Sequence, residues 1–81
     1  MFFYRPTQQQ LDVAWVLQCY GWLIPRNSAI APADFAERIR QSFTMFEPHN
    51  ARAVAIVEQL RGVFIHDGPT VSFTPEGSNV A

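Results

Sequence analysis

Few side chains in this sequence could carry out covalent or acid–base chemistry, and they are scattered. The chain holds one cysteine, Cys19, and two histidines, His49 and His66, seventeen positions apart. A nucleophilic thiol needs a base beside it, and nothing in the sequence places either histidine near Cys19. Two histidines without a cysteine pair also fall short of a zinc ligand set. We therefore expect Cys19 to be a buried, inert thiol and predict no metal site and no cofactor.

The remaining polar residues do not form an enzyme motif. Asp34 and Glu37 stand at i and i+3 near the start of a predicted helix, where carboxylates compensate the helix dipole rather than share a proton. The four glycines lie at the ends of predicted elements and form no phosphate-binding loop. We predict no catalytic residues and expect a protein that is not an enzyme.

Charge and composition narrow the function classes further. The 81 residues include six arginines, no lysine and seven acidic residues, for a net charge of −1. Nucleic-acid binding requires several cations against phosphates, so this balance disfavours it. Apolar residues make up 48%, which favours a folded chain over a disordered one. With no apolar run long enough to span a membrane, we expect one cytoplasmic domain over residues 1–81.

Hydrophobic spacing predicts three helices. Residues 8–20 follow a capping box formed by Thr7 and Gln10, and Gly21 suits the position after the helix. Pro32 starts the second helix, over 32–43, and Gly62 ends the third, over 49–61. The apolar stripe of the first helix is broad, so that most of its circumference should be buried. The stripes comprise Leu11, Val13, Ala14, Trp15, Val16, Leu17, Cys19 and Tyr20; Phe35, Ile39, Phe43 and Phe46; and Ala53, Ile56, Val57 and Leu60.

Strand signals surround the last two helices. Residues 29–30 suit a very short strand, and the runs 63–65 and 71–73 suit a hairpin whose loop, 66–70, contains Asp-Gly. The apolar segment 1–6 is expected to be a strap on the core or a dimer contact, and residues 78–81 a flexible tail. These elements predict an α+β fold with a three-helix core and a C-terminal β-hairpin.

Two short runs resemble the winged helix-turn-helix family. Ile56 to Ile65, a Leu-containing helix end followed by Gly and an apolar strand, is similar to the end of its recognition helix and its first wing strand. Val71 to Gly77, with its Thr-Pro-Glu-Gly ending, is similar to its second wing strand. The resemblance covers residues 8–77 and implies that the third helix enters the DNA major groove while the hairpin touches the backbone.

The residues that would bind DNA depart from the family pattern. The outward face of the third helix carries Arg52 as its one cation, offset by Glu58, and the turn 67–70 has no Arg or Lys. We therefore expect a winged-helix-like regulatory or inhibitory protein, of a type encoded by phages or mobile elements, that binds a larger protein. The alternative is a dimeric DNA-binding transcription regulator. In either case the expected binding face comprises Asn50, Arg52, Ala55 and Gln59.

Aromatic residues supply candidate anchors for a partner or a second copy of the chain. Trp, Tyr and Arg dominate binding hot spots, and aromatics make up 14% of this sequence. The expected anchors are Phe2, Phe3, Tyr4 and Trp22, each with a core position as the alternative. Trp15 is expected to belong to the core.

Overall fold

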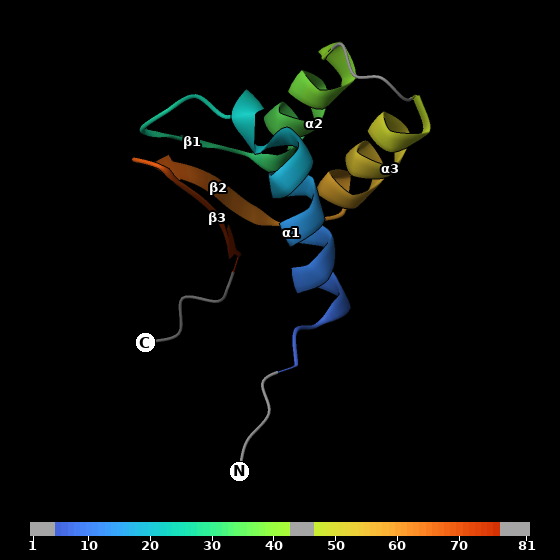
Figure 1. The fold of residues 1–81 in the computed structure, drawn as a ribbon, viewed down its shortest axis with the longest axis horizontal. Coiled ribbons are helices and arrows are strands. Elements are labelled where there is room, and N and C mark those ends of the chain that lie inside the picture. Colours follow the sequence, from blue (N-terminus) through green and yellow to red (C-terminus); the bar gives the residue numbers. More distant parts are fainter. Residues whose placement is uncertain (1–4, 43–46, 77–81) are drawn as a thin grey trace.

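A computed structural model describes residues 5–42 and 47–76 (Figure 1). Within these residues, three α-helices and a three-stranded antiparallel sheet confirm the predicted α+β class and element order. No helix in the described part is long and apolar enough to cross a membrane. The elements are α1 (Gln8–Tyr20), the short 3₁₀-helix η1 (Gly21–Leu23), β1 (Ser28–Ile30), α2 (Pro32–Gln41), α3 (Glu47–Glu58), β2 (Gly62–Asp67) and β3 (Thr70–Pro75).

Helix α1 starts at the predicted capping box. The Thr7 hydroxyl accepts a hydrogen bond from the Gln10 amide at 3.1 Å, and the Gln10 side chain accepts one from the Thr7 amide at 2.7 Å. The predicted bounds 8–20 are confirmed. Gly21 does not take the left-handed conformation expected after a helix. Its φ of −57° keeps it right-handed, and the chain continues directly into η1.

The buried face of α1 is narrower than predicted. Val13, Val16 and Tyr20 are buried, whereas Leu11 is 51% exposed. Cys19 is exposed, so the prediction of a buried thiol is wrong. Adjacent helical residues point about 100° apart, and the helix turns Tyr20 rather than Cys19 toward the core. An apolar stripe this broad does not by itself specify which side is covered.

Helices α2 and α3 both end before the predicted residue. In α2, Phe35 and Ile39 are buried as predicted, and the helix ends at Gln41, while Phe43 and Phe46 lie outside the described residues. The predicted third helix, 49–61, instead spans Glu47–Glu58. The amides of Gln59 and Leu60 bond to carbonyls three residues back, which tightens the last turn and releases the chain toward β2.

The hairpin is longer and its loop shorter than predicted. Strands β2 and β3 pair from Gly62 opposite Pro75 to Asp67 opposite Thr70, so most of the predicted loop 66–70 belongs to the strands. Gly68 has a φ of +61° and precedes Pro69. A glycine of positive φ in the first central position is typical of a type II′ turn, whose twist matches that of the strands.

The core lies between the helices and one face of the sheet. Phe64, on the central strand β2, is fully buried between Phe35 and Phe73, with ring centroids 4.7 Å apart on each side. The predicted lean of the hairpin on the helices is therefore confirmed. The buried apolar residues are Val13, Val16, Tyr20, Ile24, Ile30, Phe35, Ala36, Ile39, Ala53, Val57 and Phe64.

Candidate protein-binding surfaces

The predicted face of α3 is divided by its packing. Asn50 is half-buried, and its Oδ1 accepts a 2.6 Å hydrogen bond from the Tyr20 hydroxyl of α1. Ala55 and Gln59 are exposed and line a shallow groove with Arg52, with a volume of about 420 Å³, between α3 and α1. The structure thus brings three of the four predicted residues together and turns Asn50 toward the helix interface.

Arg52 is exposed but stands against an aromatic ring. Its guanidinium carbon lies 4.6 Å from the centroid of the Trp15 ring. His49, one turn earlier on α3, stacks on Trp15 at 5.4 Å with an interplanar angle of 30°. Trp15 is half-buried and packs against the core, as predicted. Since a cation over an indole face is attracted by the ring quadrupole, Arg52 already has a partner within the molecule.

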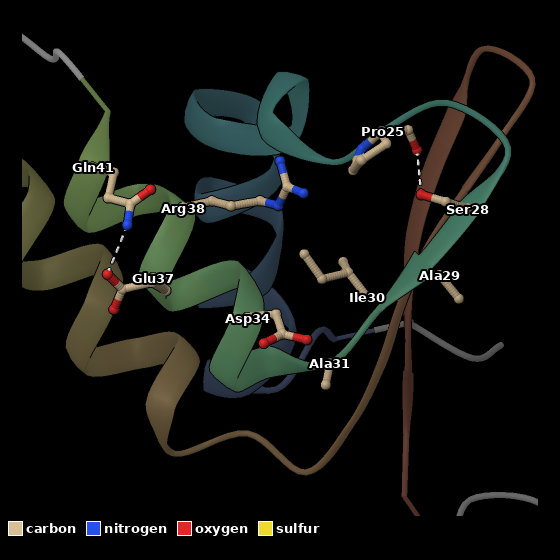
Figure 2. A pocket seen from close by; sticks show the side chains of 9 residues that line it. All are labelled: Pro25, Ser28, Ala29, Ile30, Ala31, Asp34, Glu37, Arg38 and Gln41. Atoms are coloured by element: carbon tan, nitrogen blue, oxygen red, sulfur yellow. Dashed lines mark hydrogen bonds between the residues drawn. The ribbon is translucent and has the colours of Figure 1, made fainter.

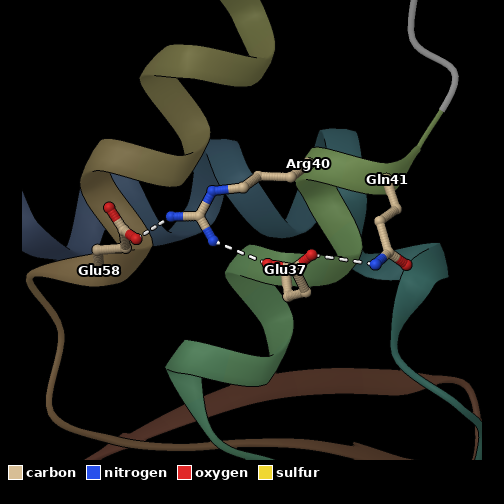
Figure 3. A network of polar contacts seen from close by, with 4 residues as sticks. All are labelled: Glu37, Arg40, Gln41 and Glu58. Atoms are coloured by element: carbon tan, nitrogen blue, oxygen red, sulfur yellow. Dashed lines mark hydrogen bonds and ion pairs between the residues drawn. The ribbon is translucent and has the colours of Figure 1, made fainter.

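Arg40 is the centre of an ion-pair network between α2 and α3 (Figure 3). Its guanidinium donates to Glu58 and, at 3.1 Å, to Glu37, while Gln41 donates to the other Glu37 oxygen at 3.0 Å. Hydrogen bonding to Glu58 raises the pKa of Arg40 above its usual value, with Glu37 acting in the same direction. The positive charge of Arg40 is therefore compensated by two carboxylates, one of them on the last residue of α3.

Trp22 is the one proposed aromatic anchor within the described residues. Its side chain is 65% exposed, and the indole N–H donates to the Cys19 carbonyl at 2.9 Å. This bond satisfies the polar atom of the ring and restrains its orientation. Phe2, Phe3 and Tyr4 lie outside the described residues.

A groove that the sequence did not reveal lies between β1 and α2 (Figure 2). Its volume is about 560 Å³, and it is open to solvent. Its strand side is formed by Ser28 to Ala31 and its helix side by polar residues of α2, with Pro25 at one end. The spacing of Asp34 and Arg38, four positions apart, places both on one side of α2. That this side of α2 lies beside the free edge of β1 becomes clear only from the strand pairing.

Two hydrogen bonds link the segment that precedes β1 to the hairpin. Its Nδ1 lies 2.8 Å from the Ile24 carbonyl, and the Asn27 side chain accepts a 3.2 Å hydrogen bond from the Gly68 amide. Asn27 itself has a positive φ of 56°, which asparagine tolerates better than most residues. Both bonds connect the segment between η1 and β1 to the hairpin and so restrain the loop at one end of the groove.

Comparisons with known proteins do not place this chain in a family. No family model, no curated protein and no solved structure matches this chain. Among the described residues, no three His, Cys, Asp or Glu side chains come close enough to hold a metal ion. The surfaces above are therefore interpreted from their own geometry.

Proposed function

We propose that this is a small, non-enzymatic regulatory or inhibitory protein that acts in the cytoplasm by binding a larger protein, on a winged-helix-like scaffold. The observation that carries the proposal is the state of the cations around α3. Arg40 is paired with two carboxylates, and Arg52 stands against Trp15. Binding DNA would require breaking these contacts or adding phosphates beside Glu58.

The distribution of the other arginines supports the same conclusion. Arg5 precedes α1, Arg26 lies between η1 and β1, Arg38 is on α2 and Arg61 precedes β2. A domain that binds nucleic acid gathers its cations on one face. None of these four arginines lies on α3, and the hairpin turn between Asp67 and Thr70 carries none.

Trp22 supports a protein partner. A large, exposed aromatic side chain whose polar atom is already bonded loses little on transfer to an apolar interface, and it is restrained before binding. Such rigid aromatic side chains are typical anchors of protein interfaces.

The second candidate function is a dimeric DNA-binding transcription regulator. It is favoured by one observation: Arg52 and Gln59 lie exposed in the same groove of α3. Arginine and glutamine are side chains that read base edges in the major groove.

Duplex DNA binding separates the two functions. We expect no change in the fluorescence anisotropy of a labelled random-sequence duplex at about 50 mM salt, where non-specific binders show affinity and a steep salt dependence. Salt-sensitive binding that is lost in Arg52→Ala and kept in the control Arg5→Ala would instead establish the DNA-binding function.

A partner-capture experiment tests the protein-binding function directly. The wild-type chain, Trp22→Ala and the matched exposed control Leu11→Ala are used as baits in an extract of native host cells. We expect one protein to be retained stoichiometrically by the wild type and by Leu11→Ala and to be lost by Trp22→Ala. Equal retention by all three baits would contradict the anchor role of Trp22.

A further inference from the structure

The free edge of β1 presents unpaired backbone groups to the groove beside α2. The two-residue turn makes Asp67 and Thr70 a hydrogen-bonded pair, so alternate residues of β2 bond to β3 and the others bond to β1. Phe64 and His66 therefore exchange hydrogen bonds with Ile30 and Ser28. Ala29, between them, points its N–H and C=O away from β2, at the free edge that borders the groove.

The opposite edge of the sheet is less suited to pairing. By the same alternation, Val71 and Phe73 present the outward groups of β3, and prolines at positions 69 and 75 flank them. Prolines lack the N–H donor, and they are a common means by which proteins block an edge strand. Further pairing at β3 is therefore limited to the stretch between the two prolines, whereas no proline lies within β1.

The helix side of the groove carries two charges without a partner in the described chain. Asp34 and Arg38 are both exposed, and neither takes part in an ion pair or side-chain hydrogen bond there. Glu37, by contrast, is occupied by Arg40 and Gln41. Figure 2 shows Asp34 beside Ala31 and the Arg38 guanidinium turned toward Pro25. A negative charge thus marks the C-terminal end of β1 and a positive charge its N-terminal end.

We propose that the groove between β1 and α2 binds an extended peptide segment of a partner protein as an added antiparallel strand. The segment exchanges backbone hydrogen bonds with Ala29. It places a Lys or Arg near Asp34 and, further toward its C-terminus, an Asp or Glu near Arg38. Antiparallel pairing together with the order of the two charges sets the direction of the peptide. This inference rests on the proposed protein-binding function and specifies one of its surfaces.

A charge-swap selection tests the order of charges. Random peptides displayed on phage are selected against the wild type and against Asp34→Lys/Arg38→Glu, which has the same net charge. We expect the wild type to enrich peptides with the cation before the acid, and the double variant to enrich the reverse order. The control Arg61→Glu changes an exposed arginine outside the groove and should select the same peptides as the wild type.

Two outcomes of the selection would overturn the proposal: no enrichment with the wild type, or the same charge order from both baits. If the double variant fails to fold, the neutral variants Asp34→Asn and Arg38→Gln take its place. Each should weaken the best peptide about tenfold, as expected for one charge-assisted hydrogen bond, and unchanged affinity in both would also overturn the proposal.

A backbone variant tests the added strand. Ala29→Pro removes the outward N–H and leaves the bonds to β2 intact, because that N–H points away from β2. Edge strands tolerate proline at such positions. We expect the best wild-type peptide to bind at least about tenfold more weakly, because one peptide carbonyl is left without its hydrogen-bond donor. The circular dichroism spectrum of the variant should be unchanged. In an NMR titration of the wild type, the amide chemical-shift changes caused by the peptide should centre on residues 29 and 38. Shifts centred on Trp22 would refute the groove and leave the proposed protein-binding function standing.

Discussion

Helix α3 meets its two neighbouring helices in different ways. Toward α2 the buried part of the contact is apolar, and the Arg40–Glu58 ion pair is exposed. Phe35, Ala36 and Ile39 are fully buried, in the same cluster as Ala53 and Val57 of α3. Toward α1 it is aromatic and polar, with Asn50 bonded to Tyr20 and with His49 and Arg52 against Trp15.

This difference separates stability from surface chemistry. Burial of apolar side chains supplies most of the free energy of folding, so the α2 side should hold α3 in place. The α1 side engages Asn50 and Arg52, two of the α3 residues predicted to bind a ligand. These two side chains therefore contribute to the helix interface. The proposed binding surfaces are accordingly Trp22 and the groove beside β1.

The largest effect is expected on the apolar side. Ile39→Ala should lower the free energy of unfolding by about 2–5 kcal/mol, because it leaves a cavity in a fully buried site. Urea denaturation followed by circular dichroism measures this, and Arg38→Ala on the exposed side of the same helix is the control. An effect no larger than that of the control would show that α2 does not hold α3.

A smaller effect is expected for the hydrogen bond between α1 and α3. Tyr20→Phe keeps the ring in the core and removes the hydroxyl that donates to Asn50, so we expect a loss of about 1 kcal/mol. A double-mutant cycle with Asn50→Ala isolates the pair. Additive losses would mean that the bond contributes nothing to the interface.

The contact between Arg52 and Trp15 should contribute less to the free energy of unfolding than the Tyr20–Asn50 hydrogen bond. Arg52→Ala removes an exposed cation over an indole face, and we expect a loss of about 0.5–1 kcal/mol together with a change in tryptophan fluorescence. Arg61→Ala, which removes an exposed arginine elsewhere, is the control. Equal effects of the two substitutions would show that the Trp15 contact is not stabilising.

The ion-pair network should have the smallest effect. Arg40 and its carboxylate partners are largely exposed, and such pairs contribute little and are screened by salt. Arg40→Ala should lower the thermal midpoint slightly at low salt and leave it unchanged at about 1 M salt, where the Debye length is about 3 Å. A decrease that persists at high salt would indicate that the arginine acts by packing instead.

The candidate sites were only partly predictable. Arg52, Ala55 and Gln59 share a surface because helical spacing alone places them on one side of α3. The separation of Asn50 follows from the same spacing, because residue 50 points about 200° away from residue 52 on a helix. Its hydrogen-bond partner was not predictable, because Tyr20 lies thirty positions away. The groove beside α2 was missed because an unpaired strand edge is defined by which strand pairs with which, and the sequence does not encode that locally.

The sequence by itself determined the features that depend on near neighbours. The capping box starts α1, the 3.6-residue period of Phe35 and Ile39 sets the inner side of α2, and Gly68 sets the hairpin turn. Only the tertiary structure decided which side of the broadly apolar α1 is covered, and hence that Cys19 is exposed. Local hydrogen bonds and backbone conformation select an element and its start, whereas the burial of a helix with apolar residues on most sides depends on packing against distant segments.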